Sequence, residues 1–428
     1  MNKFFRYKVF SGALQFTLFI GVLIALLLAG LVLLTYSHSF FILQSESAVQ
    51  NIQLSNTAIN YLLENAPKSR DTITLEELTF DNQKVQIQHS PWGIYDKGIV
   101  KTTNRKKVFY KSAFLGTQFD SQDRLAIYLQ ENFKPLTLVG NTIIKGTAFL
   151  PDQGVRPGNI AGESYYGQNL IQGLIKRSNA SLPKLEKNFR KNLELIGVVF
   201  QIAKQEDYLS DNQLLKYTNS FLKQTKVFKS DEVIVLDNIQ LIGNIIIQSN
   251  KEIKVKNTTQ LKDIILIAPI IELEDKVEGN FQLIANKSIK IGKECNLNYP
   301  SALVLIQDKK RSSDSEINPF ENQIYIDQKT QIKGTICYFE SIKEDNFKTQ
   351  IILNEQATIT GEVYCEGNFE LAGILSGTVY TYQFVSNKAG SIFINHIYNG
   401  QIISEDLPSS FCGLLFEQEK KGVAKWLY

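Results

Sequence analysis

Hydrophobic residues follow three patterns along the chain: an unbroken run near the amino terminus, short alternating bursts in the middle, and a six-residue rhythm in the carboxyl-terminal half. The run from 13 to 34, ALQFTLFIGVLIALLLAGLVLL, contains no charged residue. A helix of this length rises about 30 Å, which matches the hydrocarbon core of a bilayer. It exceeds the roughly 7 to 15 apolar residues of a cleaved secretory signal. Residues 13–34 are therefore predicted to be a retained transmembrane helix.

Basic residues lie on one side of this span. Lys3, Arg6 and Lys8 precede it, and residues 35–54 contain neither Lys nor Arg. The positive-inside rule places residues 1–12 in the cytoplasm and the large remainder outside it. We expect a single-pass protein of the cytoplasmic (inner) membrane with a periplasmic or otherwise extracytoplasmic carboxyl-terminal domain.

Residues 35–66 continue with mostly helical spacing of apolar positions and are predicted to be an amphipathic helical stalk that ends before Pro67. Its expected apolar face comprises Val49, Ile52, Leu54, Ile59 and Leu62 or Leu63. A short basic leader that closes on Gly12, followed by such a helix, resembles the start of type IV pilins and pseudopilins. Processing after Gly12 would make Thr17 the fifth mature residue, where major pilins of that family carry glutamate. An uncleaved signal anchor is the preferred interpretation of this segment.

The middle of the chain is predicted to be a β-rich region over 67–182, because bursts such as VQIQ at 85–88 and LAIYL at 125–129 alternate between turn-rich pieces. PWGIYDKG at 91–98 fits a hairpin connection. The glycine-dense segment from Gly146 to Gly173 lacks the GxxxxGK string of a phosphate-binding loop, so tight turns are expected there. Residues 183–231 are predicted to be a helical connector, with Leu185, Phe189 and Leu193 four residues apart.

The strongest internal signal is a six-residue rhythm that starts at Val235 and runs to Cys295. Ten of its eleven positions are apolar, where a chain with 43% hydrophobic residues would supply about five by chance. Those positions are Val235, Leu241, Ile247, Ile253, Thr259, Ile265, Ile271, Val277, Leu283, Ile289 and Cys295. A second apolar column follows two residues behind, on the same strand face.

Each six-residue unit therefore predicts one short strand, and three units predict a coil of 18 residues. Stacked coils would align three ladders of aliphatic residues. The ladders are Ile253 with Ile271 and Ile289, Val255 with Leu273 and Ile291, and Ile247 with Ile265 and Leu283. The fold class expected is mostly β: a transmembrane helix, a small β-rich region, and a parallel β-helix over 232–400.

The rhythm pauses at residues 308–322, whose charge, serine and proline content indicates a loop outside the stack. It resumes with three apolar-x-Gly-x-apolar units that begin at Ile332, Ile359 and Leu375, and Ile144 begins a fourth copy. These units and the β-branched columns resemble bactofilins, which implies a right-handed β-helix. The left-handed β-helix of hexapeptide acyltransferases has the same six-residue period. Those enzymes carry a catalytic histidine, and His396 is the one histidine in the late part of this repeat. We prefer to interpret His396 as an ordinary structural residue.

The composition of the chain argues against several classes of function. Forty-six Lys and Arg residues oppose 43 Asp and Glu residues, and a net charge of +3 does not favour a nucleic-acid-binding protein. Cys295, Cys337, Cys365 and Cys412 include no CxxC pair, so neither a zinc site nor a redox motif is expected. A disulfide between Cys337 and Cys365 is one possibility and buried free thiols are the preferred one.

A polysaccharide site would need acidic or basic groups gathered on adjacent coils. Asp263, Glu272 and Glu274 are the nearest approach to one, and Glu272 with Glu274 fits a solvated strand face better. The tail 401–428 carries apolar residues suited to a cap or to docking on a partner; they are Phe411, Leu414, Leu415, Phe416 and Trp426.

The sequence thus favours a membrane-anchored structural or assembly protein that presents a rigid β-helix to an envelope partner or to copies of itself. No catalytic, cofactor-binding or metal-binding residue is predicted, and no enzymatic activity is expected. The alternative is a minor pilin-like subunit of a filament or secretion machine. A polysaccharide-binding or polysaccharide-degrading protein is the third possibility.

Overall fold

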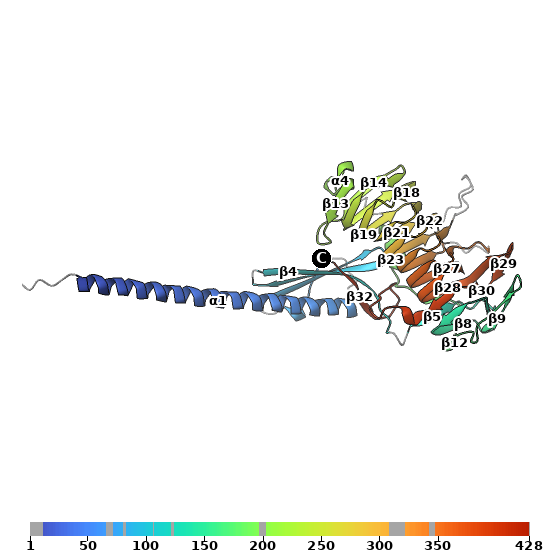
Figure 1. The fold of residues 1–428 in the computed structure, drawn as a ribbon, viewed down its shortest axis with the longest axis horizontal. Coiled ribbons are helices and arrows are strands. Elements are labelled where there is room, and N and C mark those ends of the chain that lie inside the picture. The colour runs from blue at the N-terminus through green and yellow to red at the C-terminus, as the bar shows by residue number, and fades with distance from the viewer. Residues whose placement is uncertain are drawn as a thin grey trace, which may run out of the picture. The chain divides into compact units, whose positions relative to one another are not determined.

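The computed structural model describes residues 12–65, 72–79, 83–105, 107–120, 124–196, 203–307, 322–341 and 347–427. The chain divides into two compact units. The first contains the chain up to Asn60 together with Ile73–Ile87 and Val100–Tyr110, and the second contains Tyr61–Thr72, Gln88–Ile99 and Lys111–Tyr428. The fold is mostly β, with one long apolar amino-terminal helix and a large parallel sheet (Figure 1). This coarse architecture is the one that the sequence predicts.

Helix α1 runs without interruption over Gly12–Glu64, so the predicted span and the predicted stalk are one helix of 53 residues. Its length is about 80 Å at 1.5 Å per residue. The buried stripe of its second half consists of Asn51, Ser55, Ala58, Ile59 and Leu62. Val49 and Ile52, which the sequence places on the apolar face of the stalk, are exposed instead. The prediction is wrong for these two residues, because Asn51 and Ser55 occupy the packed face there, whereas Ile59 and Leu62 are buried as predicted.

A five-stranded sheet has the strand order β1-β2-β3-β4-β32. Its strands are β1 (Ile73–Thr74), β2 (Gln83–Trp92), β3 (Tyr95–Asn104), β4 (Lys107–Thr117) and β32 (Lys421–Leu427). β1 pairs antiparallel with β2, and β32 pairs antiparallel with β4. The predicted hairpin connection is a tight turn between Trp92 and Tyr95.

Gln282 holds this turn. Its Oε1 accepts a hydrogen bond from the backbone N–H of Ile94 at 2.9 Å, and its Nε2 donates to the Trp92 carbonyl at 3.1 Å. Gly93 has a φ of +64°, and a Cβ at this position would lie 1.8 Å from the Gln282 Oε1. The left-handed backbone favours glycine here, and a larger residue would displace Gln282 from its hydrogen bonds with the turn.

The large parallel sheet contains most of the remaining strands, which stack in register (Figure 1). They are β5 (Leu125–Leu129), β7 (Ile143–Lys145), β8 (Thr147–Leu150), β12 (Ile175–Arg177), β13 (Lys216–Asn219), β14 (Lys226–Ser230), β15 (Ile234–Leu236), β16 (Gln240–Gly243), β17 (Ile245–Ser249), β18 (Glu252–Val255), β19 (Gln260–Ile267), β20 (Ile270–Leu273), β21 (Glu278–Ala285), β22 (Ser288–Ile291), β23 (Asn296–Ile306), β24 (Gln323–Ile326), β25 (Gln331–Phe339), β26 (Ile351–Leu353), β27 (Thr358–Leu371), β28 (Ile374–Lys388) and β31 (Gln401–Ile403).

Smaller elements complete the described chain. A three-stranded parallel sheet contains β6 (Leu136–Val139), β9 (Val155–Pro157) and β30 (His396–Tyr398). β10 (Asn159–Ile160) pairs with β11 (Glu163–Ser164), and β29 (Ser391–Ile394) pairs antiparallel with β28. The short helices are η1 (Glu76–Leu78), α2 (Phe189–Leu195), η3 (Gln205–Asp207), α4 (Asp211–Leu215) and η4 (Ser404–Asp406).

Two of the three predicted ladders occur as predicted. Ile253 pairs with Ile271, which pairs with Ile289, and the Val255, Leu273 and Ile291 ladder runs beside them. All six residues are buried in one continuous cluster between the strands. The ladder continues to Ile324 in β24, which lies beyond the segment 308–322. The predicted loop falls almost entirely on residues 308–321, which are outside the described residues.

The third predicted ladder is wrong by one residue. Ile247 pairs with Leu266, which pairs with Leu283, whereas Ile265 pairs with Ile246 and with Gln282. The cause is a register shift between Lys262 and Ile264, where Asp263 has a φ of 62°. One extra residue moves every following side chain to the opposite face. The predicted six-residue rhythm also fails at its first position. Val235 is exposed, while Ile234 and Leu236 are buried.

The apolar-x-Gly-x-apolar units stack directly upon one another. Gly334 pairs with Gly361, which pairs with Gly377, and each has a φ near +153°. A Cβ on Gly361 would lie 1.8 Å from the Gly334 carbonyl oxygen. The stack then continues through Ile402 to Ile144, so the fourth copy in the glycine-dense segment belongs to the same sheet.

The predicted helical connector over 183–231 is wrong for β13 and β14, which are strands of the stack. Only α2 and α4 are α-helical among its described residues. The tail 401–428, expected to be a cap or a tail that docks on a partner, contributes β31 to the parallel sheet and β32 to the antiparallel one.

The four cysteines are buried free thiols. Cys337 and Cys365 lie on neighbouring strands one residue out of register, and they belong to separate hydrophobic clusters on opposite strand faces. The suggested disulfide between them is therefore wrong.

Candidate functional site

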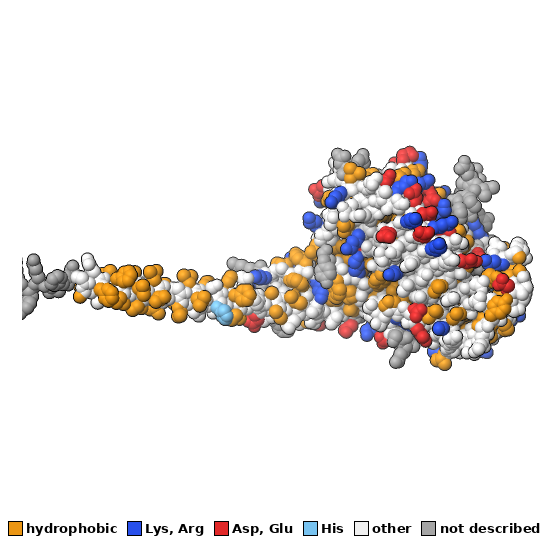
Figure 2. Space-filling model, in the orientation of Figure 1, with side chains coloured by type: hydrophobic (Ala, Val, Ile, Leu, Met, Phe, Trp, Pro, Cys, Tyr) orange, Lys and Arg blue, Asp and Glu red, His pale blue; other side chains and the backbone are white. Residues whose placement is uncertain are grey.

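The first half of α1 consists mostly of exposed apolar side chains, and Figure 2 shows them along the face in view. No other described helix is long and apolar enough to cross a membrane, and the apolar window of α1 is not buried within the chain. Two of its hydroxyl groups form hydrogen bonds inside the helix. The Thr17 hydroxyl donates to the Leu14 carbonyl at 3.0 Å, and the Thr35 hydroxyl donates to the Leu31 carbonyl at 2.8 Å. This segment has the properties of a membrane span.

Apolar exposure does not stop where the predicted span ends. Large apolar side chains past Leu34 remain open to solvent; they are Tyr36, Phe40, Phe41, Ile42, Leu43, Val49 and Ile52. Phe41 is 70% exposed and Ile52 is 44% exposed. From residue 35 to residue 52 the helix rises about 27 Å, which is almost a second bilayer core. One membrane crossing cannot cover this second segment, here called the distal apolar segment and comprising residues 36–52.

The opposite side of the same turns is packed on strands of the first unit. The Thr102 hydroxyl donates to the Asn51 carbonyl at 3.2 Å, and the Asn104 Nδ2 donates to the Gln50 Oε1 at 2.8 Å. The Lys107 ammonium donates to the Gln44 Oε1 at 2.8 Å. The helix is thus held in one rotational setting, which leaves Val49 and Ile52 facing outward.

The acidic residues that the sequence singled out are engaged in structural ion pairs. Glu272 accepts from the Lys290 ammonium at 2.7 Å, and Glu274 pairs with Lys256. Asp263 accepts from the Asn280 Nδ2 at 2.6 Å and from the Lys425 ammonium at 2.5 Å. Each of the three carboxylates therefore has a partner within the chain.

His396 lies half-buried in β30. Its Nδ1 lies 2.7 Å from the Ile394 carbonyl oxygen, and burial lowers its pKa. The described residues contain no group of three or more His, Cys, Asp or Glu side chains that could hold a metal ion.

A buried acid that sequence reasoning missed lies in β27. Glu362 is 2% exposed, and its carboxylate accepts a hydrogen bond from the backbone N–H of Leu414 at 3.0 Å. Arg124 donates to the carbonyl oxygens of Leu407 and Ser409 in the same tail. Burial raises the pKa of Glu362 to about 7, and this effect outweighs the Leu414 hydrogen bond and the Arg124 charge. No spacing in the sequence distinguishes this glutamate from a solvated one.

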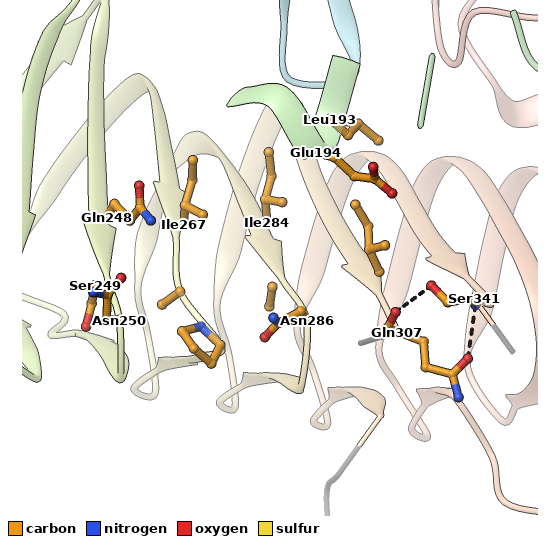
Figure 3. A pocket seen from close by; sticks show the side chains of 14 residues that line it. Leu193, Glu194, Gln248, Ser249, Asn250, Ile267, Ile284, Asn286, Gln307 and Ser341 are labelled. Carbon is orange, nitrogen blue, oxygen red and sulfur yellow. Dashed lines mark hydrogen bonds between the residues drawn. The ribbon is translucent and has the colours of Figure 1, made fainter. Parts of the chain in front are cut away.

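A groove of about 540 Å³ lies on the outward face of the stack, beside α2 (Figure 3). Its floor contains Ile267, Ile284 and Ile306 from three successive rungs, and amide side chains line it at the strand ends. Glu194 of α2 stands at its edge. No local pattern in the sequence marks this groove, because its described lining residues come from six separate segments.

No protein-family model matches the chain, and no curated protein matches it. Among solved structures, the chain is similar to the crystal structure of a competence-associated pilin, ComZ, from Thermus thermophilus. The two chains share 9% sequence identity, and the likeness covers 84% of this chain and 86% of that chain with a TM-score of 0.22. A TM-score this low carries no argument about fold or function.

Proposed function

We propose that this chain is a non-enzymatic, pilin-like subunit, which is anchored in a membrane through the first half of α1 and assembles with other subunits through the distal apolar segment. The observation that carries the proposal is apolar exposure along α1 past the predicted span. Exposed apolar surface of this extent marks a membrane or protein interface. Lipid covers about 30 Å of it, and neighbouring helices are the natural cover for the rest.

The proposal includes the orientation inferred from the sequence. The amino terminus lies in the cytoplasm, α1 crosses the inner membrane once, and the remainder of the chain lies in the periplasm or outside the cell. The charge asymmetry around residues 13–34 supports this orientation. The resemblance of the first residues to type IV pilins supports assembly into a filament or secretion machine, with Thr17 in place of glutamate as a departure.

For the second unit, we infer that the stacked strands form a bactofilin-like, right-handed parallel β-helix that acts as a rigid domain carried by the subunit. Support comes from the registers, in which Ile253, Ile271, Ile289 and Ile324 follow one another on parallel strands. Nearly all inward residues between these strands are aliphatic. Such a core closes only when successive rungs cover one another.

A second candidate is a scaffold that presents this β-helix to an envelope partner or to another copy, without a filament. The specific observation is an exposed edge at β12, where Leu174 and Ile175 are both more than half exposed. An uncovered strand edge is able to pair with another chain.

Cysteine crosslinking in native membranes tests the pilin-like proposal. Phe41→Cys should give covalent dimers and higher multimers with a thiol crosslinker, because Phe41 lies in the distal apolar segment. Lys293→Cys, an exposed position in the stack, is the matched control and should remain monomeric. The native thiols give little background, since burial raises the pKa of Cys295 to about 11 and of Cys365 to about 12. Monomeric Phe41→Cys would contradict the proposal.

Sequencing the amino terminus of the mature protein distinguishes the two candidates. A new terminus at Ala13 is expected for a processed pilin-like subunit. An intact Met1 with no crosslinked multimers would leave the anchored scaffold as the better account.

A further inference from the structure

We propose that the groove beside α2 is a docking site for a peptide segment of a partner protein, and that this segment carries aliphatic side chains and a basic residue. The groove lies wholly within the second unit. The proposal does not depend on assembly through α1.

The floor of the groove is aliphatic. Ile267 pairs with Ile284 on the adjacent strand, and Ile306 lies on the next rung, two residues beyond Val304, the register partner of Ile284. Neighbouring strands lie about 4.8 Å apart, so Ile267 and Ile284 begin a row of apolar side chains along the stack, and Ile306 continues it with an offset along the strand. Figure 3 shows Ile267 and Ile284 side by side along this face. A row of this kind suits the side chains of a peptide laid along the stack.

Two side-chain amide oxygens in the wall of the groove accept no hydrogen bond from the described residues. The Gln248 Oε1 and the Asn286 Oδ1 are shielded from solvent and have no hydrogen-bond partner among the described residues. A buried acceptor without a donor is costly, and a ligand that supplies N–H groups removes that cost once the amide side chains turn these oxygens into the groove. Both side chains line the groove, at opposite sides of the Ile267 rung (Figure 3). A polypeptide backbone offers N–H donors at regular intervals.

The charge of the groove lining restricts the chemical class of the ligand further. Glu194 is the one charged residue among the described residues that line the groove, and it forms no ion pair with a described residue. A carboxylate without a basic partner favours a Lys or Arg side chain on the ligand. The described lining contains no Lys, Arg or His, which disfavours phosphates and other anions. It also contains no aromatic ring on which a sugar would stack.

Selection from a phage-displayed library of random 12-residue peptides, with the full chain in lipid nanodiscs as bait, tests this proposal. Enriched peptides should share two aliphatic residues and a Lys or Arg. A synthetic consensus peptide should bind at least tenfold more weakly to Glu194→Lys and to Ile267→Asp, measured by fluorescence anisotropy. The same peptide with its basic residue changed to glutamate should regain affinity for Glu194→Lys.

Glu278→Lys is the matched control, because it makes the same charge change at an exposed position of the stack outside the groove. It should bind the consensus peptide with unchanged affinity. Glu194 is itself exposed, so its replacement should leave the thermal unfolding of the chain unaltered, and a circular dichroism melt checks this. Failure to enrich any peptide, as when residues of the same chain fill the groove, would overturn the proposal. Equal binding to wild type, Glu194→Lys and Glu278→Lys would overturn it as well.

Discussion

Helix α1 and the parallel stack are both rich in aliphatic residues, yet the apolar surface of these residues is covered in different ways. In the stack, Ile271 has neighbours of its own chain on every side and is fully buried. In α1, Leu43 is half exposed and has no such neighbours. A repeating strand provides its own cover, because the next rung presents the same residue type. A single helix has no next rung, so its apolar surface must be covered by lipid or by another chain.

The same mutation should therefore have different consequences in the two regions. Substitutions in the stack should change the free energy of unfolding. Substitutions in the distal apolar segment should leave stability nearly unchanged and reduce association.

The largest effect is expected at the glycine ladder. Gly361→Val would place a Cβ against the Gly334 carbonyl oxygen and force a branched residue to a φ of +153°. We expect a loss of about 5 kcal/mol in the free energy of unfolding, or failure to fold. Urea denaturation or soluble yield would show this. Thr360→Val, one residue earlier with an ordinary backbone, should cost less than about 1 kcal/mol. Similar behaviour of the two variants would refute the ladder's role.

A matched pair of alanine substitutions compares the two regions directly. Ile271→Ala should lower the free energy of unfolding by about 4 kcal/mol, because it leaves a cavity between stacked rungs. Leu43→Ala should change it by less than about 0.5 kcal/mol, since little surface is buried there in one chain. In membranes, Leu43→Ala combined with Phe41→Cys should give fewer crosslinked multimers. Equal destabilisation by both substitutions would mean that α1 is covered within its own chain.

Stability should also depend on pH through Glu362. Its pKa is about 7 in the fold and near 4.5 in the unfolded chain, so the folded state binds the proton more tightly between these values. Stability should fall as pH rises from 4.5 to 7, by about 3 kcal/mol from this group, and should be restored on acidification. Glu362→Gln should remove most of that slope and still accept the Leu414 hydrogen bond. Denaturation of both proteins at pH 5 and pH 8 measures the difference. An unchanged slope would assign it to other groups.

The smallest effect is expected on the solvated face of the stack. Glu272 lies between Lys254 and Lys290 on neighbouring strands and pairs with Lys290 at 2.7 Å. Glu272→Gln should cost about 0.5 kcal/mol, and the cost should vanish in 1 M salt. A loss that persists at high salt would indicate a packing role instead.

The sequence predicts the regular repeats of this molecule better than the positions where the repeat is interrupted. The ladders through Ile253 and Val255 follow from spacing alone, because each rung repeats the same residue at the same offset. The ladder through Ile265 does not, since one inserted residue at Asp263 changes the face without changing the composition. The strands β13 and β14 were also missed, because they lie outside the clear period.

The stalk of α1 shows a different limit. Periodicity identifies an amphipathic helix, but it does not reveal which stripe is packed. Here Asn51, Ser55 and Ala58 are buried, and Val49 and Ile52 are exposed. The sequence does not predict Glu362 as a buried acid, or the groove beside α2, for a related reason. Both depend on segments far apart in the sequence, and no local pattern marks them.

The central claim is that other subunits cover the distal apolar segment. A cysteine-accessibility measurement tests it most directly, with Ile52→Cys labelled by a soluble maleimide in native membranes and again after dispersal to monomers in detergent. Residue 52 lies well beyond the predicted span, so the detergent belt should not reach it. The account predicts slow labelling in membranes and fast labelling after dispersal. Equally fast labelling in both states would show that this surface is bare in the membrane and would contradict the account.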